Sequence, residues 1–129
     1  MALEDHPAHN TEAEQAFLGC LLLDDRLLAE IFPALDDDDF YVEQYRQVYR
    51  MIRTLAGSGR PVDRAAFVAE SMRTGAADIE DLTKQFDRIS GSVPHAANGQ
   101  SYADIIRSKR IERDIMSCHE RARGPAREG

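Results

Sequence analysis

One apolar repeat in the middle of the chain constrains the fold more than any other feature of the sequence. Its members step by four and three residues over about four helical turns: Tyr41, Tyr45, Val48, Ile52 and Leu55. Side chains at this spacing share one face of an α-helix, because the helix turns once every 3.6 residues. Gly57-Ser58-Gly59 follows, and glycine readily adopts the left-handed conformation that ends a helix. The stretch therefore predicts an amphipathic helix with one buried face.

Shorter apolar stripes on both sides of this repeat also have helical spacing, and no alternating pattern is long enough to predict a strand. The further helices are predicted to begin at Thr11, at Asp24 or Asp25, at Asp63 and at Asp78. Thr11-Glu12-Ala13-Glu14 has the form of a capping box, in which Glu14 bonds back to the first turn. Gly19 interrupts the first of these helices, which predicts the close approach of another helix.

These patterns predict an all-α fold: a compact bundle of about five to six short helices, followed by one longer terminal helix. The expected boundaries are a flexible amino-terminal tail at 1–9, the bundle at 10–97, the terminal helix at 98–121 and a frayed tail at 122–129. The length of 129 residues fits one core and one domain.

The predicted terminal helix has apolar residues on two opposite sides. At 100° per residue, one group lies together and comprises Tyr102, Ile105, Ile106 and Met116. The other group lies nearly opposite and comprises Ile111, Ile115 and Cys118. A terminal helix on a bundle needs only one apolar face, so the second face needs its own partner. We expect an oligomer or partner interface that involves Tyr102, Ile105, Ile111, Ile115 and Cys118, with another copy of the chain or a different protein as the partner.

Four consecutive aspartates, residues 36 to 39, precede Phe40 and Tyr41. A metal site needs several carboxylates that converge on one point, and consecutive residues point in different directions. We therefore favour a structural role, with Asp38 or Asp39 as the cap of the helix that follows and the other charges near its positive end. Asp39, Phe40, Tyr41 and Tyr45 are expected to anchor the entry of that helix to the core.

The remaining chemistry of the sequence gives no catalytic arrangement. There are only two lysines, Lys84 and Lys109, and neither belongs to a glycine-rich phosphate-binding loop. The four histidines have no cysteine or carboxylate partners at metal-site spacing, and Cys20 and Cys118 fall among apolar neighbours. We expect no metal and no cofactor. The acidic amino terminus and the lack of an apolar run near the roughly 20 residues of a membrane span predict a cytoplasmic protein.

The net charge of -7 argues against a strong grip on nucleic acid. The candidates for contact with DNA are Arg107, Lys109, Arg110 and Arg113, and acidic residues interrupt them on their helix face. Contact with DNA is therefore expected to be weak and indirect at most.

Three stretches together resemble the amino-terminal domain of DnaB-type replicative helicases. They are EAEQAFLGCLLLD at 12–24, DDFYVEQYRQVYRMIRTLAGSGRPVD at 38–63 and PHAANGQSYADIIRSKRIER at 94–113, and the resemblance covers roughly residues 7 to 116. It departs from the family at Gly75-Ala76-Ala77, where the family usually carries Gly-Gly followed by Tyr-Leu.

The resemblance implies a helical bundle followed by a helical hairpin, which forms a collar on a hexameric ring and contacts primase and helicase loaders. In the family ATP and Mg²⁺ act in a separate motor domain with a P-loop, which this sequence does not contain. Ile111 and Ile115 fall where the second hairpin helix would pack. The leading hypothesis is thus a non-catalytic collar domain in DNA replication that forms homo-oligomers and meets primase or a loader. The alternatives are a free-standing homologue that binds and modulates helicase or primase, and a metal-dependent enzyme that uses Asp36–Asp39.

Overall fold

The computed structural model describes residues 10–24, 27 and 35–128, with side chains as far as Cys118. The elements of this part are α1 (Thr11–Leu23), the 3-10 turn η3 (Asp37–Asp39), α3 (Glu43–Gly57), α4 (Arg64–Arg73), α5 (Ile79–Ser90) and α6 (Gly99–Glu128). No strand occurs among the described residues, so the predicted all-α class is confirmed. The predicted helix from Asp24 or Asp25 to Phe32 falls mostly outside the described residues.

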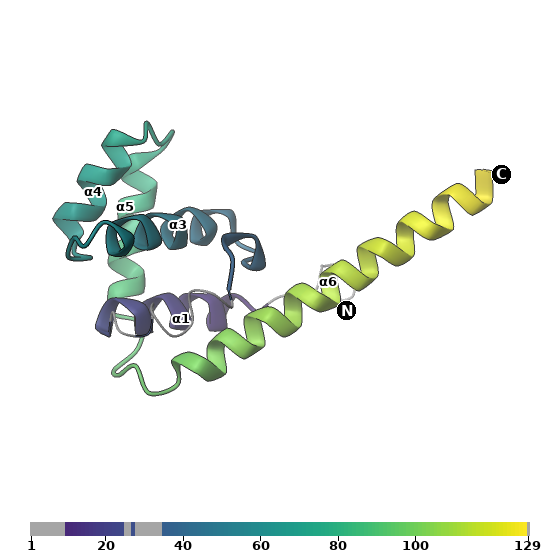
Figure 1. The fold of residues 1–129 in the computed structure, drawn as a ribbon, viewed down its shortest axis with the longest axis horizontal. Helices are drawn as coiled ribbons and strands as arrows, with labels where there is room; N and C mark the ends of the chain where they lie inside the picture. Colours follow the sequence, from purple (N-terminus) through teal and green to yellow (C-terminus); the bar gives the residue numbers. More distant parts are fainter. Residues whose placement is uncertain (1–9, 25–26, 28–34, 129) are drawn as a thin grey trace.

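Four of the helices form a bundle, and the fifth leaves it (Figure 1). Helices α1, α3, α4 and α5 pack together, while the first part of α6 runs along α1 and the remainder extends well beyond the bundle. None of the described helices combines the length and the apolar character that a membrane crossing requires.

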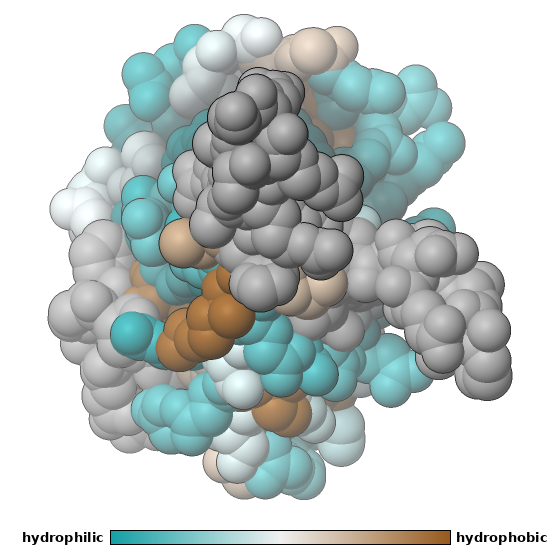
Figure 2. Space-filling model, turned by 90° about the vertical axis from the view of Figure 1, so that its right-hand side faces the viewer, coloured by the Kyte–Doolittle hydropathy of each residue, from teal (hydrophilic) through white to brown (hydrophobic). Residues whose placement is uncertain are grey.

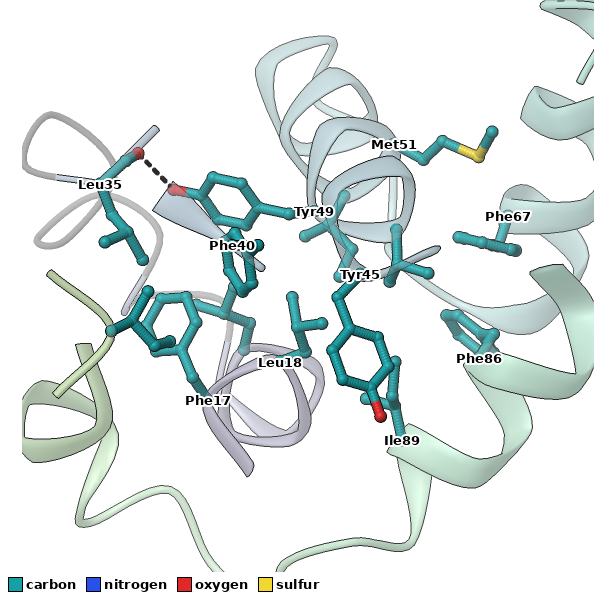
Figure 3. Close-up of a cluster of buried hydrophobic side chains, with 14 of the residues drawn as sticks. Phe17, Leu18, Leu35, Phe40, Tyr45, Tyr49, Met51, Phe67, Phe86 and Ile89 are labelled. Carbon is teal, nitrogen blue, oxygen red and sulfur yellow. Dashed lines mark hydrogen bonds between the residues drawn. The ribbon is translucent and has the colours of Figure 1, made fainter. Parts of the chain in front are cut away.

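The core of the bundle has two aromatic centres. Phe17, Phe40 and Tyr49 meet with ring centroids 4.9–6.1 Å apart, and Phe67 stacks on Phe86 at 4.6 Å. Figure 3 shows both centres and the hydrogen bond that the Tyr49 hydroxyl donates to the Leu35 carbonyl, 2.8 Å long. Burial raises the pKa of Tyr49 to about 12, so this hydroxyl stays protonated and remains a donor over the whole pH range in which proteins normally fold.

The apolar repeat on α3 forms the centre of this core. Its buried members are Tyr45, Val48, Ile52 and Leu55. Tyr41, the first member of the repeat, is half-buried and lies before the helix begins at Glu43. Ser58 follows the helix, and Gly59 has a φ of 72°, the left-handed conformation that was expected there.

The helix starts predicted at Asp63 and Asp78 are confirmed, whereas the cap predicted at Thr11 is wrong. Asp63 accepts a hydrogen bond from the Ala66 N–H (2.8 Å), and Asp78 accepts one from the Asp81 N–H (2.9 Å). The capping box predicted at Thr11 does not form. Asn10 caps α1 instead, with its Oδ1 2.9 Å from the Ala13 nitrogen, and the Glu14 side chain points to a different element.

The terminal helix is longer than its sequence pattern indicated. The expected end at Arg121 and the frayed tail at 122–129 are not what the structure shows, because α6 continues to Glu128. Gly124 and Pro125, which disfavour the interior of a helix, suggested an earlier end.

Gly19 lies where α1 meets the end of α5, as the sequence predicted. A Cβ atom at this position would overlap the Ser92 Oγ and would come 3.1 Å from the carbonyl oxygen of Ile89. The two backbones approach closely here only because residue 19 has no side chain.

Replacing Gly19 tests this contact. We expect Gly19→Ala to destabilise the protein by about 1–3 kcal/mol, because the new methyl group forces α1 away from α5. Gly57→Ala is the matched control: an added Cβ there would meet nothing within 4 Å beyond its own stretch of helix, and Ala should be neutral or stabilising by up to about 1 kcal/mol. Urea denaturation of both variants measures the difference, and equal effects would contradict the close approach.

Candidate functional site

The four aspartates form a turn of their own and do not cap α3. The Asp36 carboxylate accepts from the Asp37 N–H (2.9 Å), and the Asp36 N–H donates to the Asp39 carboxylate (2.8 Å). The Asp36 carboxylate also accepts from the Asp39 N–H, and this bond and the one from the Asp36 N–H to Asp39 form a capping box around η3. The prediction that Asp38 or Asp39 caps the following helix is therefore wrong, because the extended residue Phe40 and then Tyr41 and Val42 separate the turn from α3.

Arginines on α3 hold the turn against the helix. Arg50 bonds Asp37 at 2.8 Å, and Arg53 lies 3.3 Å from both Asp36 and Asp37. Burial alone would raise the pKa of Asp37, but hydrogen bonds and the charge of Arg50 outweigh it and lower the pKa to about 2. Asp36 and Asp37 thus face arginines, and no three potential metal ligands gather anywhere among the described residues.

The cap of α3 comes from another helix. Val42 is the residue at its start, and the Val42 side chain makes no capping bond. The Glu14 carboxylate, on α1, fills this role: its oxygens accept from the N–H groups of Tyr41 (2.8 Å) and Val42 (3.1 Å). Glu14 is only 1% exposed. A buried carboxylate is stable here because two amides and the positive end of the α3 dipole surround it.

Helix α6 contacts the same junction through two arginines. Arg113 donates to the Asp39 carbonyl oxygen (2.9 Å), and its guanidinium lies over the Tyr41 ring, 5.5 Å from the centroid. Burial lowers the pKa of Arg113, and the charge of Glu14 opposes this shift. Arg110 lies 3.5 Å from the Asp39 carboxylate and bonds Asp114 at 3.0 Å. We call the pair Arg110 and Arg113 the clasp.

Two of the four cations predicted as weak candidates for nucleic-acid contact belong to the clasp. Lys109 pairs with Glu112 on the same helix at 3.4 Å, and Arg107 is exposed. Most of this cluster therefore faces protein partners. Contact with DNA stays a prediction, and the geometry does not favour it.

The residues predicted for the interface separate into two groups along α6. Tyr102 and Ile105 are half-buried beside the bundle, next to the buried Ile106. Ile111, Ile115 and Cys118 are exposed, the two isoleucines by 53% and 63%. We call these three residues the exposed α6 face.

Met116 departs from the prediction that it belongs with the bundle-facing group. It is 47% exposed, because α6 has already passed the bundle at this point. The helical periodicity gave the side of α6 on which Met116 lies, but it could not give how far along α6 the bundle reaches. Figure 2 looks onto the projecting end of the molecule and shows hydrophobic surface beside the grey terminal residues.

The role of Glu14 is the feature that sequence reasoning missed. The residue was assigned to a local capping box, whereas its partners lie 27 and 28 residues away. One signal was present: Glu14 lies four residues before Leu18 and seven before Leu21, so it shares the apolar side of α1, where a carboxylate is buried only if it has strong donors.

Removing the Glu14 charge tests the cap. We expect Glu14→Gln to destabilise the protein by about 2–3 kcal/mol, because a neutral amide leaves the Tyr41 and Val42 N–H groups poorly bonded in a buried place. The control is Glu12→Gln on the exposed side of the same helix turn, where the effect should stay within about 0.5 kcal/mol. Chemical denaturation measures both, and a Glu14→Gln variant as stable as the control would show that the cap contributes little.

Comparison with known proteins places this architecture in a family. The family model described as the DnaB-like helicase N terminal domain matches residues 6–108. The chain is 32% identical over 115 residues to the replicative DNA helicase DnaB of Haemophilus influenzae, which is 89% of this chain and 25% of that protein. It is 34% identical over 110 residues to the replicative DNA helicase DnaC of Bacillus subtilis, which is 85% of this chain and 24% of that protein.

The chain thus spans about a quarter of the length of these relatives. Among solved structures, the crystal structure of the N-terminal domain of DnaB helicase from Mycobacterium tuberculosis matches with a TM-score of 0.88 at 30% identity, and the match covers 96% of this chain and 88% of that one. The family resemblance indicated by the sequence is confirmed: the chain belongs to the family of DnaB-like helicase N-terminal domains.

Proposed function

We propose that the chain acts as a non-catalytic assembly domain of a replicative DNA helicase and that its first partner is a second copy of itself. The membership in the DnaB-like N-terminal domain family supports the setting, which is DNA replication. The cytoplasm is the location that we propose for it. The observation that carries the proposal is the exposed α6 face, which lies on the part of α6 that projects from the bundle.

The exposed α6 face has the properties of a helix-packing surface. Ile111 and Ile115 lie four residues apart, so they form one ridge, and Cys118 extends it by one further turn. Burying one large aliphatic side chain contributes about 1.5–3 kcal/mol, so leaving this group in water is costly. An isologous contact would set the ridge of one copy against the same ridge of the other, and both copies would be covered at once.

Charges beside the ridge suit such a contact. Cations and anions alternate along this part of α6, with Lys109 beside Glu112 and Arg110 beside Asp114. A patch that carries both signs can meet its own copy without net repulsion, whereas a surface of one sign cannot.

The catalytic chemistry would belong to another part of the helicase. ATP and Mg²⁺ would act in a separate motor domain, and this chain would contribute contacts only. Primase and the helicase loader are the further partners that we propose for it, once self-association has formed a composite surface.

Two charges placed on the ridge test the proposal. We expect the wild-type chain to self-associate and the Ile111→Glu/Ile115→Glu variant to be a monomer, because a carboxylate cannot enter an apolar helix contact without a large desolvation cost. Light scattering across a concentration series measures the mass. The variant should keep its thermal unfolding transition, since both positions are exposed.

Met72→Glu is the matched control. Met72 is 64% exposed on α4, so it is as accessible as the ridge but lies on a different helix. This variant should associate like the wild type. A wild-type chain that stays monomeric at all concentrations would contradict self-association; if that monomer captured purified primase or full-length helicase, the chain would instead be a modulator of those proteins.

A further inference from the structure

Within the part of the chain that the structure describes, two contacts of different chemistry join helix α6 to the bundle. The first is apolar: Ala103 and Ile106 are buried, and an added Cβ at Gly99 would come 2.9 Å from the Leu27 Cδ1 and 3.6 Å from the Cβ of Cys20 on α1. The second is the clasp, which binds the Asp39 carbonyl and carboxylate and the Tyr41 ring. Beyond Arg113 the described side chains of α6 are exposed.

Two attachments fix the direction of a rigid rod, whereas one attachment lets it pivot. Ile106 and Arg113 are seven residues apart, or about 10 Å along the helix. Cys118 lies twelve residues beyond Ile106, at about 18 Å, so a swing of about 15° around Ile106 moves it by about 5 Å. The exposed α6 face lies at or beyond the clasp, and its position relative to the bundle therefore depends on the second attachment.

We propose that the clasp is a positioning device: Arg110 and Arg113 hold α6 at a fixed angle to the bundle by gripping the junction between η3 and α3, and α6 pivots about its apolar attachment when the grip is lost. The contact joins three elements at one point. Glu14 of α1 binds the Tyr41 and Val42 amides from one side, while Arg113 covers Tyr41 and binds Asp39 from α6.

The chemistry of the clasp makes it easier to release than the apolar attachment. The Arg110 side chain is 32% exposed and the Asp39 side chain 16% exposed, so salt screens this pair. The contacts of Ala103 and Ile106 are buried and do not depend on charge. Loss of the clasp should therefore leave α6 joined to α1 but free to change its angle. The proposal concerns one chain and stands whether or not the chain self-associates.

A distance measurement between the bundle and α6 tests the proposal. Spin labels are placed on the native, exposed Cys118 and on Ala69→Cys, an exposed position in α4, with the buried Cys20 replaced by alanine. The labelled protein is diluted with unlabelled chain, so that pulsed electron resonance reports distances within one molecule. We expect one narrow distance distribution for the labelled protein with the clasp intact. For Arg110→Gln/Arg113→Gln the distribution should be broader by about 5 Å, the displacement of Cys118 calculated above.

Lys109→Gln is the matched control. It removes one cation from the same helix, but its partner Glu112 also lies on α6, so the distribution should stay narrow. Arg113→Lys keeps the charge and loses the planar guanidinium; it should broaden the distribution without unfolding the bundle, and it replaces the double variant if that one does not fold. An unchanged width in the folded clasp variants, or equal broadening in Lys109→Gln, would overturn the proposal.

Discussion

The carboxylate of Glu14 connects the first helix of the bundle to the start of its central helix. It replaces the local cap that α3 lacks, since Val42 makes no side-chain bond there. A charged group with 1% exposure costs several kcal/mol of desolvation, and two amide donors and the α3 dipole are needed to offset this cost. This requirement fixes the position of α1 relative to α3, and the aromatic centre of Phe17, Phe40 and Tyr49 then forms between them.

The aspartate turn η3 also binds arginines from two different helices. Asp36 and Asp37 bind Arg50 and Arg53 of α3, whereas Asp39 faces Arg110 of α6. Three of the four carboxylates therefore pair with arginines, two of them with α3 and one with the projecting helix. An acidic run that suggests a metal site or a single helix cap is, in the folded protein, a junction at which α3 and α6 meet.

The parts of the fold that depend on neighbouring residues could be predicted from the sequence. The apolar repeat of α3 and the caps Asp63 and Asp78 are local, because each acts within about one helical turn of its own position. The close approach at Gly19 was also predictable, since a glycine inside a strong helical pattern needs a reason. The roles of Glu14 and Arg113 were not, because their partners lie 27 and 74 residues away. Met116 shows the same limit: the helical angle gave its side, but only the packed bundle decides where that side is covered.

Amide hydrogen exchange at Tyr41 and Val42 tests the central claim most directly. These two N–H groups have no carbonyl acceptor in a preceding helical turn, and their hydrogen bonds go to Glu14. If the carboxylate ties α1 to α3, both amides should exchange as slowly as that of Ile52 in the buried part of α3, through unfolding of the whole bundle. Exchange of both amides at the rate of an unprotected peptide, while Ile52 stays protected, would contradict the account.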